Sequence, residues 1–91
     1  MNLKRAPVTA PSASVLIDDV LDGYVAWREE NAAAENAYRN WLWAGRAERR
    51  LAFAAYTAAL DREELAAADY QRLIERAERR LAISPTSRAV D

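Results

Sequence analysis

The chain has 91 residues, enough for one small domain; hydrophobic residues make up 52% of it, but 21 of them are alanine, so few large apolar side chains are left for a core. It contains no cysteine and no histidine, which excludes a disulfide framework, a Cys/His zinc site, a thiol nucleophile and a histidine base. The formal net charge is -1, so the chain as a whole has no electrostatic preference for nucleic acid or for a lipid surface.

Residues 1–14 form the first segment of the chain. They contain two of the three prolines and mostly small or polar side chains, so we expect a flexible N-terminal arm. Pro7 and Pro11 fall where a signal peptide needs an unbroken apolar stretch, and no segment approaches the roughly 20 apolar residues that cross a bilayer. The sequence therefore predicts a cytoplasmic protein without a membrane span.

The second segment, residues 15–82, consists almost entirely of helix-forming residues. Ser12 or Ser14 can cap its start, and Asp18 and Asp19 favour the positive end of the helix dipole. Apolar side chains recur every three or four residues, and the first run contains Ile17, Val20, Tyr24, Trp27, Asn31, Ala34, Tyr38 and Trp41. This spacing predicts an amphipathic helix.

A second run has the same spacing and contains Phe53, Tyr56, Leu60, Glu63, Ala67, Tyr70, Ile74, Ala77 and Leu81. The interval between Trp41 and Phe53 breaks the spacing, and Gly45 lies within it, so we predict a turn near residues 43–46. The predicted fold is all-α, a long antiparallel helical hairpin with coiled-coil-like packing. Pro85 ends the second helix, which leaves residues 83–91 as a C-terminal tail.

Folding back at this turn would pair residues whose numbers add to about 90, so that large side chains meet small ones. The expected neighbours are Ala34 with Tyr56, Trp27 with the Glu63–Ala67 turn, and Val20 with Tyr70. This complementarity of size favours a hairpin over two unrelated helices.

Three residues leave alternatives open. Gly23 lies inside the first helix, and Asp61 begins an Asp-Arg-Glu-Glu stretch that resembles a helix N-cap, so a break at either would give three helices or more. Asn31 is the polar member of the first run. It is either a partly exposed residue that tolerates its position, or a register-setting asparagine that pairs with its mate in a dimer.

The sequence carries no recognisable catalytic pattern. Carboxylate metal sites in helical bundles use Glu-x-x-His pairs, and histidine is absent. A Gly-rich phosphate loop and a Gly-x-Ser-x-Gly elbow are absent as well. Carboxylates such as Asp22 and Glu29 fit a solvated helix face. We therefore predict a protein that is not an enzyme and that binds no cofactor or metal.

Charge alternates along the chain. Residues 18–35 sum to -5 and residues 39–50 to +3, whereas residues 61–69 sum to -3 and residues 72–80 to +2. A single hairpin leaves these charges poorly matched. Shifted side-by-side association would place the basic tip of one copy against the acidic middle of another, so the pattern predicts a homo-oligomer.

The predicted turn gathers tryptophan and arginine, which are the residue types most enriched at interface hot spots. The candidate partner-binding residues are Arg39, Trp41, Trp43, Arg46, Arg49 and Arg50. Trp41 and Trp43 are two residues apart, so they cannot both face the partner helix. One alternative is that Trp43 packs over the turn or beneath the N-terminal arm. Another is that the arginines grip a nucleic-acid backbone while a base stacks on an indole.

The tripeptide Trp43-Ala44-Gly45 carries a resemblance. A cysteine-free chain of this length, folded as a helical hairpin with Trp-x-Gly at the turn, resembles the WXG100 family of small secreted proteins. The resemblance implies dimerisation and export through a type VII secretion system. The C-terminal Tyr-x-x-x-Asp/Glu signal of that family is not matched, because Ile74 stands four residues after Tyr70.

The residues predict a non-enzymatic helical module for protein–protein interaction or assembly, which associates with itself or with another protein. One alternative is a small nucleic-acid-associated protein, regulatory or phage-borne, that uses the basic tip. Another is a WXG100-like secreted hairpin. Salt separates the first two functions, because a phosphate-binding tip loses affinity steeply as salt rises, whereas a desolvated tryptophan interface changes little.

Overall fold

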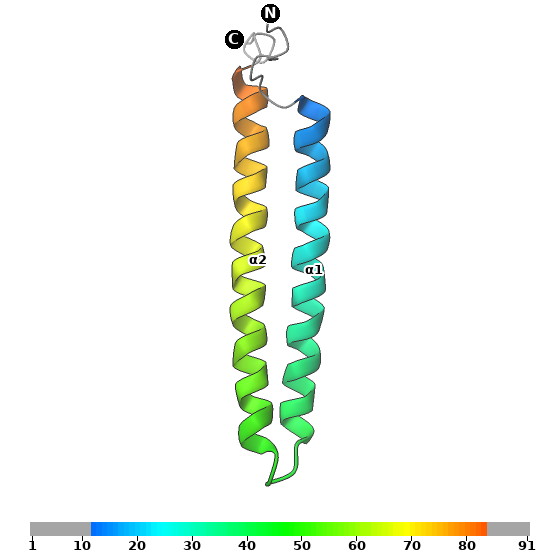
Figure 1. The fold of residues 1–91 in the computed structure, drawn as a ribbon, viewed down its shortest axis with the longest axis vertical. Helices are drawn as coiled ribbons and strands as arrows, with labels where there is room; N and C mark the ends of the chain where they lie inside the picture. Colours follow the sequence, from blue (N-terminus) through cyan, green and yellow to red (C-terminus); the bar gives the residue numbers. More distant parts are fainter. Residues whose placement is uncertain (1–11, 84–91) are drawn as a thin grey trace, which may run out of the picture.

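A computed structural model describes residues 12–83, which form two long antiparallel α-helices lying side by side (Figure 1). Helix α1 spans Ala13–Trp43 and helix α2 spans Arg49–Ile83, and these described residues contain no strand. The predicted all-α antiparallel hairpin is confirmed. Most of the expected arm and tail lies outside the described residues, although α1 already begins at Ala13 and α2 still includes Ile83.

Helix α1 begins at one of the two predicted serine caps. The backbone of Ser12 is extended (φ -67°, ψ 160°), and its Oγ accepts a hydrogen bond from the N–H of Val15 at 3.2 Å. Such a cap satisfies an amide that the first turn of a helix leaves without a partner. Ser12 is therefore the cap, and Ser14 lies inside the helix.

The chain leaves α1 after Trp43, in the interval where the turn was predicted. Ala44 is extended (φ -67°, ψ 140°), while its N–H still donates to the carbonyl of Trp41 at 3.3 Å. The N–H of Glu48 donates to the carbonyl of Gly45 at 3.1 Å, and α2 begins at the next residue. No described glycine has a positive φ, so Gly45, which follows the Ala44 C-cap, does not adopt the left-handed conformation that commonly follows a helix.

Both helices are continuous. Helix α1 passes through Gly23 and α2 passes through Asp61, so the three-helix alternative is wrong. Gly23 lies against α2, where a Cβ at this position would be 2.7 Å from Leu73 Cδ1 and 3.6 Å from the Cα of Tyr70.

The helices meet along a seam of buried and half-buried residues at alternating spacings of three and four. The seam residues are Leu16, Val20, Gly23, Trp27, Glu30, Ala34, Ala37 and Trp41 of α1, and Ala52, Tyr56, Ala59, Glu63, Ala66, Tyr70, Leu73, Ala77 and Arg80 of α2. Trp27 faces Glu63 as predicted, and its indole Nε1 donates to Oε2 at 2.7 Å. Tyr70 lies closer to the turn than predicted, because its ring centroid is 5.8 Å from those of Tyr24 and Trp27 instead of opposite Val20. Side chains lean towards the N-terminus of their helix, which for α2 is the turn, and this shifts the aromatic contacts by about one helical turn.

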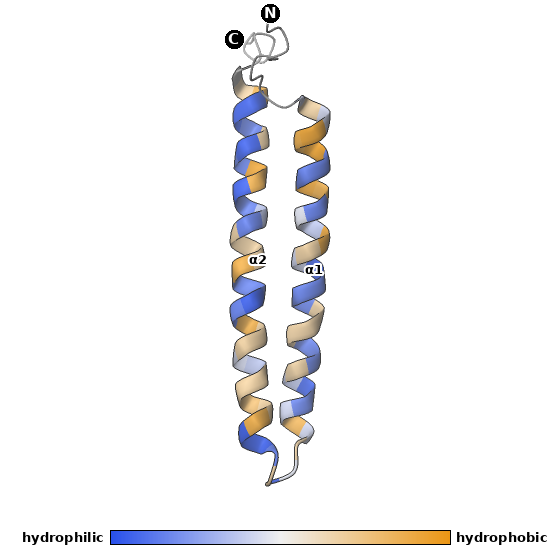
Figure 2. Cartoon of the chain, viewed as in Figure 1, coloured by the Kyte–Doolittle hydropathy of each residue, from blue (hydrophilic) through white to orange (hydrophobic). Residues whose placement is uncertain are grey.

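The hairpin has a thin core. Among the described residues only Leu16, Ala34 and Ala59 are buried hydrophobic residues, and no polar side chain is buried. Figure 2 shows hydrophobic and hydrophilic residues alternating along both helices, as in helices with one apolar stripe. Two such helices cannot enclose their stripes completely, so much apolar surface stays open to solvent.

Candidate functional site

Four aromatic residues near the turn, Tyr38, Trp41, Phe53 and Tyr56, contact one another across the two helices. Trp41 stacks on Tyr56, with ring centroids 5.7 Å apart and ring planes inclined by 14°, and its centroid lies 5.0 Å from that of Phe53. Tyr38 adds a further ring, 5.4 Å from Tyr56. Trp41 is therefore half-buried in the packing of the hairpin, with only part of its ring open to a partner.

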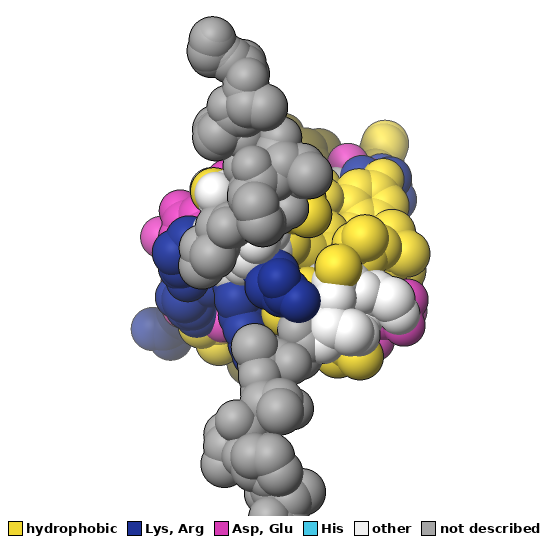
Figure 3. Space-filling model, turned by 90° about the horizontal axis from the view of Figure 1, so that it is seen from above, with side chains coloured by type: hydrophobic (Ala, Val, Ile, Leu, Met, Phe, Trp, Pro, Cys, Tyr) yellow, Lys and Arg dark blue, Asp and Glu magenta, His cyan; other side chains and the backbone are white. Residues whose placement is uncertain are grey.

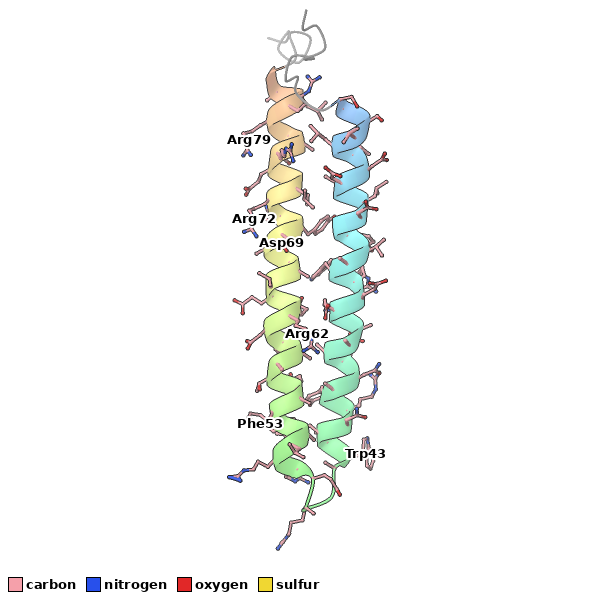
Figure 4. The ribbon with its side chains drawn as sticks, in the orientation of Figure 1. Trp43, Phe53, Arg62, Asp69, Arg72 and Arg79 are labelled. Atoms are coloured by element: carbon pink, nitrogen blue, oxygen red, sulfur yellow. The ribbon has the colours of Figure 1, made fainter. Side chains whose placement is uncertain are left out.

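The side chain of Trp43 does not take part in this packing between the helices. It is the last residue of α1, and it is 85% exposed. Figure 4 shows its side chain pointing away from α2. The alternative in which Trp43 packs over the turn is therefore wrong, and residues 1–11 of the expected arm lie outside the described residues. The expectation that Trp41 and Trp43 do not share the seam is confirmed.

The four candidate arginines surround the turn, and all are exposed. Arg39 Nη2 donates to Asn36 Oδ1 at 2.7 Å, and Arg49 Nη2 donates to the carbonyl of Ala44 at 3.4 Å, so neither contact neutralises the guanidinium charge. Arg46 and Arg50 form no ion pair with another described residue. The structure thus gathers all six candidate residues at one end of the hairpin, with Trp41 turned inward and the other five on the surface.

Sequence reasoning misses two leucines at the same end. Leu51 is 75% exposed and Leu42 is 49% exposed. Leu51 stands outside the run that begins at Phe53, and this misfit is the signal that could have identified it. We name this region the tip surface, and it consists of Arg39, Leu42, Trp43, Arg46, Arg49, Arg50 and Leu51.

A second surface runs along the whole hairpin. On both helices several large apolar residues lie one position after a seam residue, at spacings that keep them on one side of the helix. Ile17, Tyr24 and Leu60, members of the predicted runs, thus lie beside the seam and not at its centre. Their exposed fractions lie between 39% and 57%. We name this surface the apolar face, and it consists of Ile17, Leu21, Tyr24, Tyr38, Phe53, Leu60 and Leu81.

The two helices present these residues on the same broad side of the hairpin. Ile17 and Leu81 line one depression, and Tyr38 and Leu60 line another, an open groove of about 270 Å³. Figure 3, seen from above, shows hydrophobic side chains gathered at the upper right and arginines mainly at the left. The groove is lined by Asn31, Ala34, Glu35, Tyr38, Tyr56, Leu60 and Glu63. The expected neighbours Ala34 and Tyr56 thus line the same groove, and Asn31 is half-buried there.

The remaining surface of the hairpin is richer in charge. Arg62 Nε lies 3.4 Å from Glu30 Oε1 on the other helix, and Arg72 pairs with Asp69 along α2. In Figure 4, Arg72 and Arg79 project from α2 away from α1. Charged residues thus predominate on the rest of the hairpin, where Val15, Val25 and Leu65 are the exposed large apolar residues outside the two named surfaces among those described. The apolar face has no cover within the described chain.

Within residues 12–83 no group of three or more potential ligand side chains could hold a metal ion, and neither helix is long and apolar enough to cross a membrane. No family model, curated protein or solved structure matches this chain. The resemblance to the WXG100 family therefore rests on the hairpin plan and on the placement of Trp43 and Gly45 at the turn.

Proposed function

We propose that this protein is a non-enzymatic assembly module, in which two copies of the hairpin pair through their apolar faces to form a four-helix bundle. The observation that carries the proposal is the one-sided exposure of the seven large apolar side chains of this face. Each is between 39% and 57% exposed, so each is half covered by the hairpin and half available to a partner.

The extent of the face favours a helical partner of similar length. Ile17 and Leu81 lie at the open end of the hairpin and Tyr38 and Phe53 near the turn, so the face reaches both ends of α1, with the polar Asn31 between its two halves. At about 1.5 Å per residue, a helix of this length extends about 46 Å. Soluble monomers rarely expose a continuous apolar patch larger than a few hundred Å².

A second copy supplies such a partner. It is a rod of the same length with the same apolar face, and most homo-oligomers form through a self-complementary patch related by a two-fold axis. Four helices around a shared core enclose apolar stripes that two helices leave open. Asn31, half-buried among the groove residues, supplies a polar group that can bond to a polar group of the second copy.

Light scattering on a sizing column, at low and at moderate salt, tests the proposal. We expect a dimer at both salt concentrations, because burial of apolar surface depends little on ionic strength. Leu60→Glu would place a charge on the apolar face and should give a monomer. Leu65→Glu is the matched control, since Leu65 is a 62% exposed leucine of the same helix that does not follow a seam residue.

Two results would contradict the proposal. A monomer at both salt concentrations would mean that the apolar face awaits a different protein. Equal loss of the dimer in Leu60→Glu and Leu65→Glu would mean that the contact lies elsewhere on α2.

A further inference from the structure

We propose that the tip surface is a docking site for an anionic lipid surface, with Leu42, Trp43 and Leu51 entering the interfacial layer and the arginines binding headgroup phosphates. The site is separate from the proposed dimer contact, because Trp43 and Leu51 lie off the apolar face and only Leu42 adjoins it. Docking of this kind needs no membrane-spanning helix.

The apolar side chains of the tip surface radiate in different directions. Leu42 and Trp43 are consecutive helical residues, so their side chains point about 100° apart around α1. Leu51 projects from the other helix and is 75% exposed. One rigid pocket cannot receive side chains that radiate from a protruding end, whereas a fluid lipid interface surrounds all of them at once. Tryptophan is also enriched at membrane interfaces.

The charge of the tip surface matches such a surface. Between residues 36 and 60, Glu48 is the only acidic residue, against four arginines. Arg46 and Arg50 have no ion-pair partner among the described residues that would compete with a phosphate. Arginine has a long apolar stem, so its guanidinium reaches the headgroups while the stem stays with the inserted leucines.

The rest of the hairpin gives the docking its direction. Residues 18–35 sum to -5 and residues 61–69 to -3, and both stretches lie farther from the turn than the tip surface. At the open end, Asp18, Asp19 and Asp22 of α1 outweigh the +2 of residues 72–80 on α2. An anionic surface therefore repels the middle and the open end of the described hairpin and attracts the tip, so the molecule approaches it tip first.

A single-stranded nucleic acid fits the same residues less well. Binding of that kind uses successive aromatic platforms along a basic groove. The Trp41 ring is already stacked on Tyr56, which leaves Trp43 as the one freely exposed indole of the tip surface. Leu42 and Leu51 offer nothing to a base or a phosphate, whereas a lipid interface takes up both.

Co-sedimentation of the full chain with vesicles tests the proposal. The vesicles are pure phosphatidylcholine or an equal mixture of phosphatidylcholine and phosphatidylglycerol, and a single-stranded oligonucleotide is tested in parallel. We expect binding to the mixed vesicles alone. Trp43→Ala should weaken it about tenfold, since it removes one buried aromatic side chain, and Arg46→Gln with Arg50→Gln about 25-fold, at about one kcal/mol for each arginine.

The matched controls lie away from the tip surface. Leu65→Ala removes an exposed leucine and Arg79→Gln an exposed arginine, and both should bind vesicles like the unchanged chain. Circular dichroism and light scattering should show that the tip variants and these two controls keep the fold and the oligomeric state of the unchanged chain. Leu60→Glu, which should be monomeric, should still bind vesicles. This variant therefore separates a failure of the proposed dimer from a failure of the docking site.

Three results would overturn the proposal. The first is no binding to the mixed vesicles at low salt. The second is vesicle binding that the tip variants and the controls weaken equally, which would place the contact elsewhere in the chain. The third is binding to the oligonucleotide but not to vesicles, with Trp43→Ala abolishing the binding. The tip surface would then be a nucleic-acid-binding site.

Discussion

Trp27 and Glu63 join the middle of α1 to the middle of α2, because the indole Nε1 donates a partly buried hydrogen bond to the carboxylate Oε2 at 2.7 Å. The same indole stacks on Tyr70, with centroids 5.8 Å apart and planes inclined by 14°. Trp27 thus contacts two turns of α2 at once. A slip of either helix by one residue would break the hydrogen bond and the stack together, so this pair holds the register of the hairpin.

Glu63→Ala should lower the free energy of unfolding by about 1.5 kcal/mol, the size expected for a hydrogen bond to a charged group. Chemical denaturation measures this loss, with Glu64→Ala as the control, because Glu64 is an exposed neighbour without a bond to α1. Trp27→Phe combined with Glu63→Ala should cost less than the sum of the two single changes. Strictly additive losses would show that the two side chains do not act as a pair.

Gly23→Ala should raise the free energy of unfolding by up to about 1 kcal/mol, because alanine is the better helix former. The new methyl would meet Leu73 Cδ1 at 2.7 Å, but that atom ends a flexible, half-buried side chain, and the nearest Tyr70 atoms lie at 3.5 and 3.6 Å. Gly23→Val adds atoms beyond the Cβ and should instead destabilise the hairpin. Thermal unfolding, monitored by circular dichroism, measures the effect of both changes on stability. A lower melting temperature for Gly23→Ala would show that Leu73 cannot move aside.

The helices and the turn can be predicted from local features of the sequence. The three-and-four spacing from Ile17 to Trp41 and from Phe53 to Leu81 predicts two helices, and the broken spacing between them predicts the turn. The aromatic contacts of Tyr70 are displaced by about a turn, because side chains lean towards the N-terminus of their helix and a count of residues from the turn does not include this lean. The first residue of α2 was not predictable either. Residues just before Arg49 are good helix formers, and spacing alone does not show that they belong to the turn.

The candidate surfaces were predictable only in part. Spacing shows that Trp41 and Trp43 cannot share the seam, and the structure places Trp43 outside. Leu51 was not predicted because it does not fit the run beginning at Phe53, and leucine, unlike tryptophan and arginine, is not enriched at interface hot spots. The width of the apolar face, which includes Leu60, depends on the two helices presenting their stripes on the same side, and this is a tertiary relationship.

Ser12→Ala should cost about 1 kcal/mol of stability, because it removes the acceptor of the Val15 N–H at the start of α1. Ser14→Ala is the matched control, since Ser14 lies one residue into the helix, where alanine is favoured. Thermal unfolding of both variants provides the comparison. Equal melting temperatures would show that the first turn of α1 contributes nothing to the cooperative unit.

Asn31→Leu tests whether the polar residue of the groove selects one arrangement of the proposed dimer. Asn31 is half-buried beside Tyr38 and Leu60, and an asparagine in an apolar contact costs stability but permits only those registers in which its amide is bonded. The leucine variant should therefore melt at a higher temperature and give a mixture of dimers and larger oligomers in light scattering. Asn40→Leu, at an exposed position of the same helix, should leave the dimer uniform. A uniform dimer for Asn31→Leu as well would mean that the register is set by the fit of the apolar side chains, with Asn31 only tolerated among them.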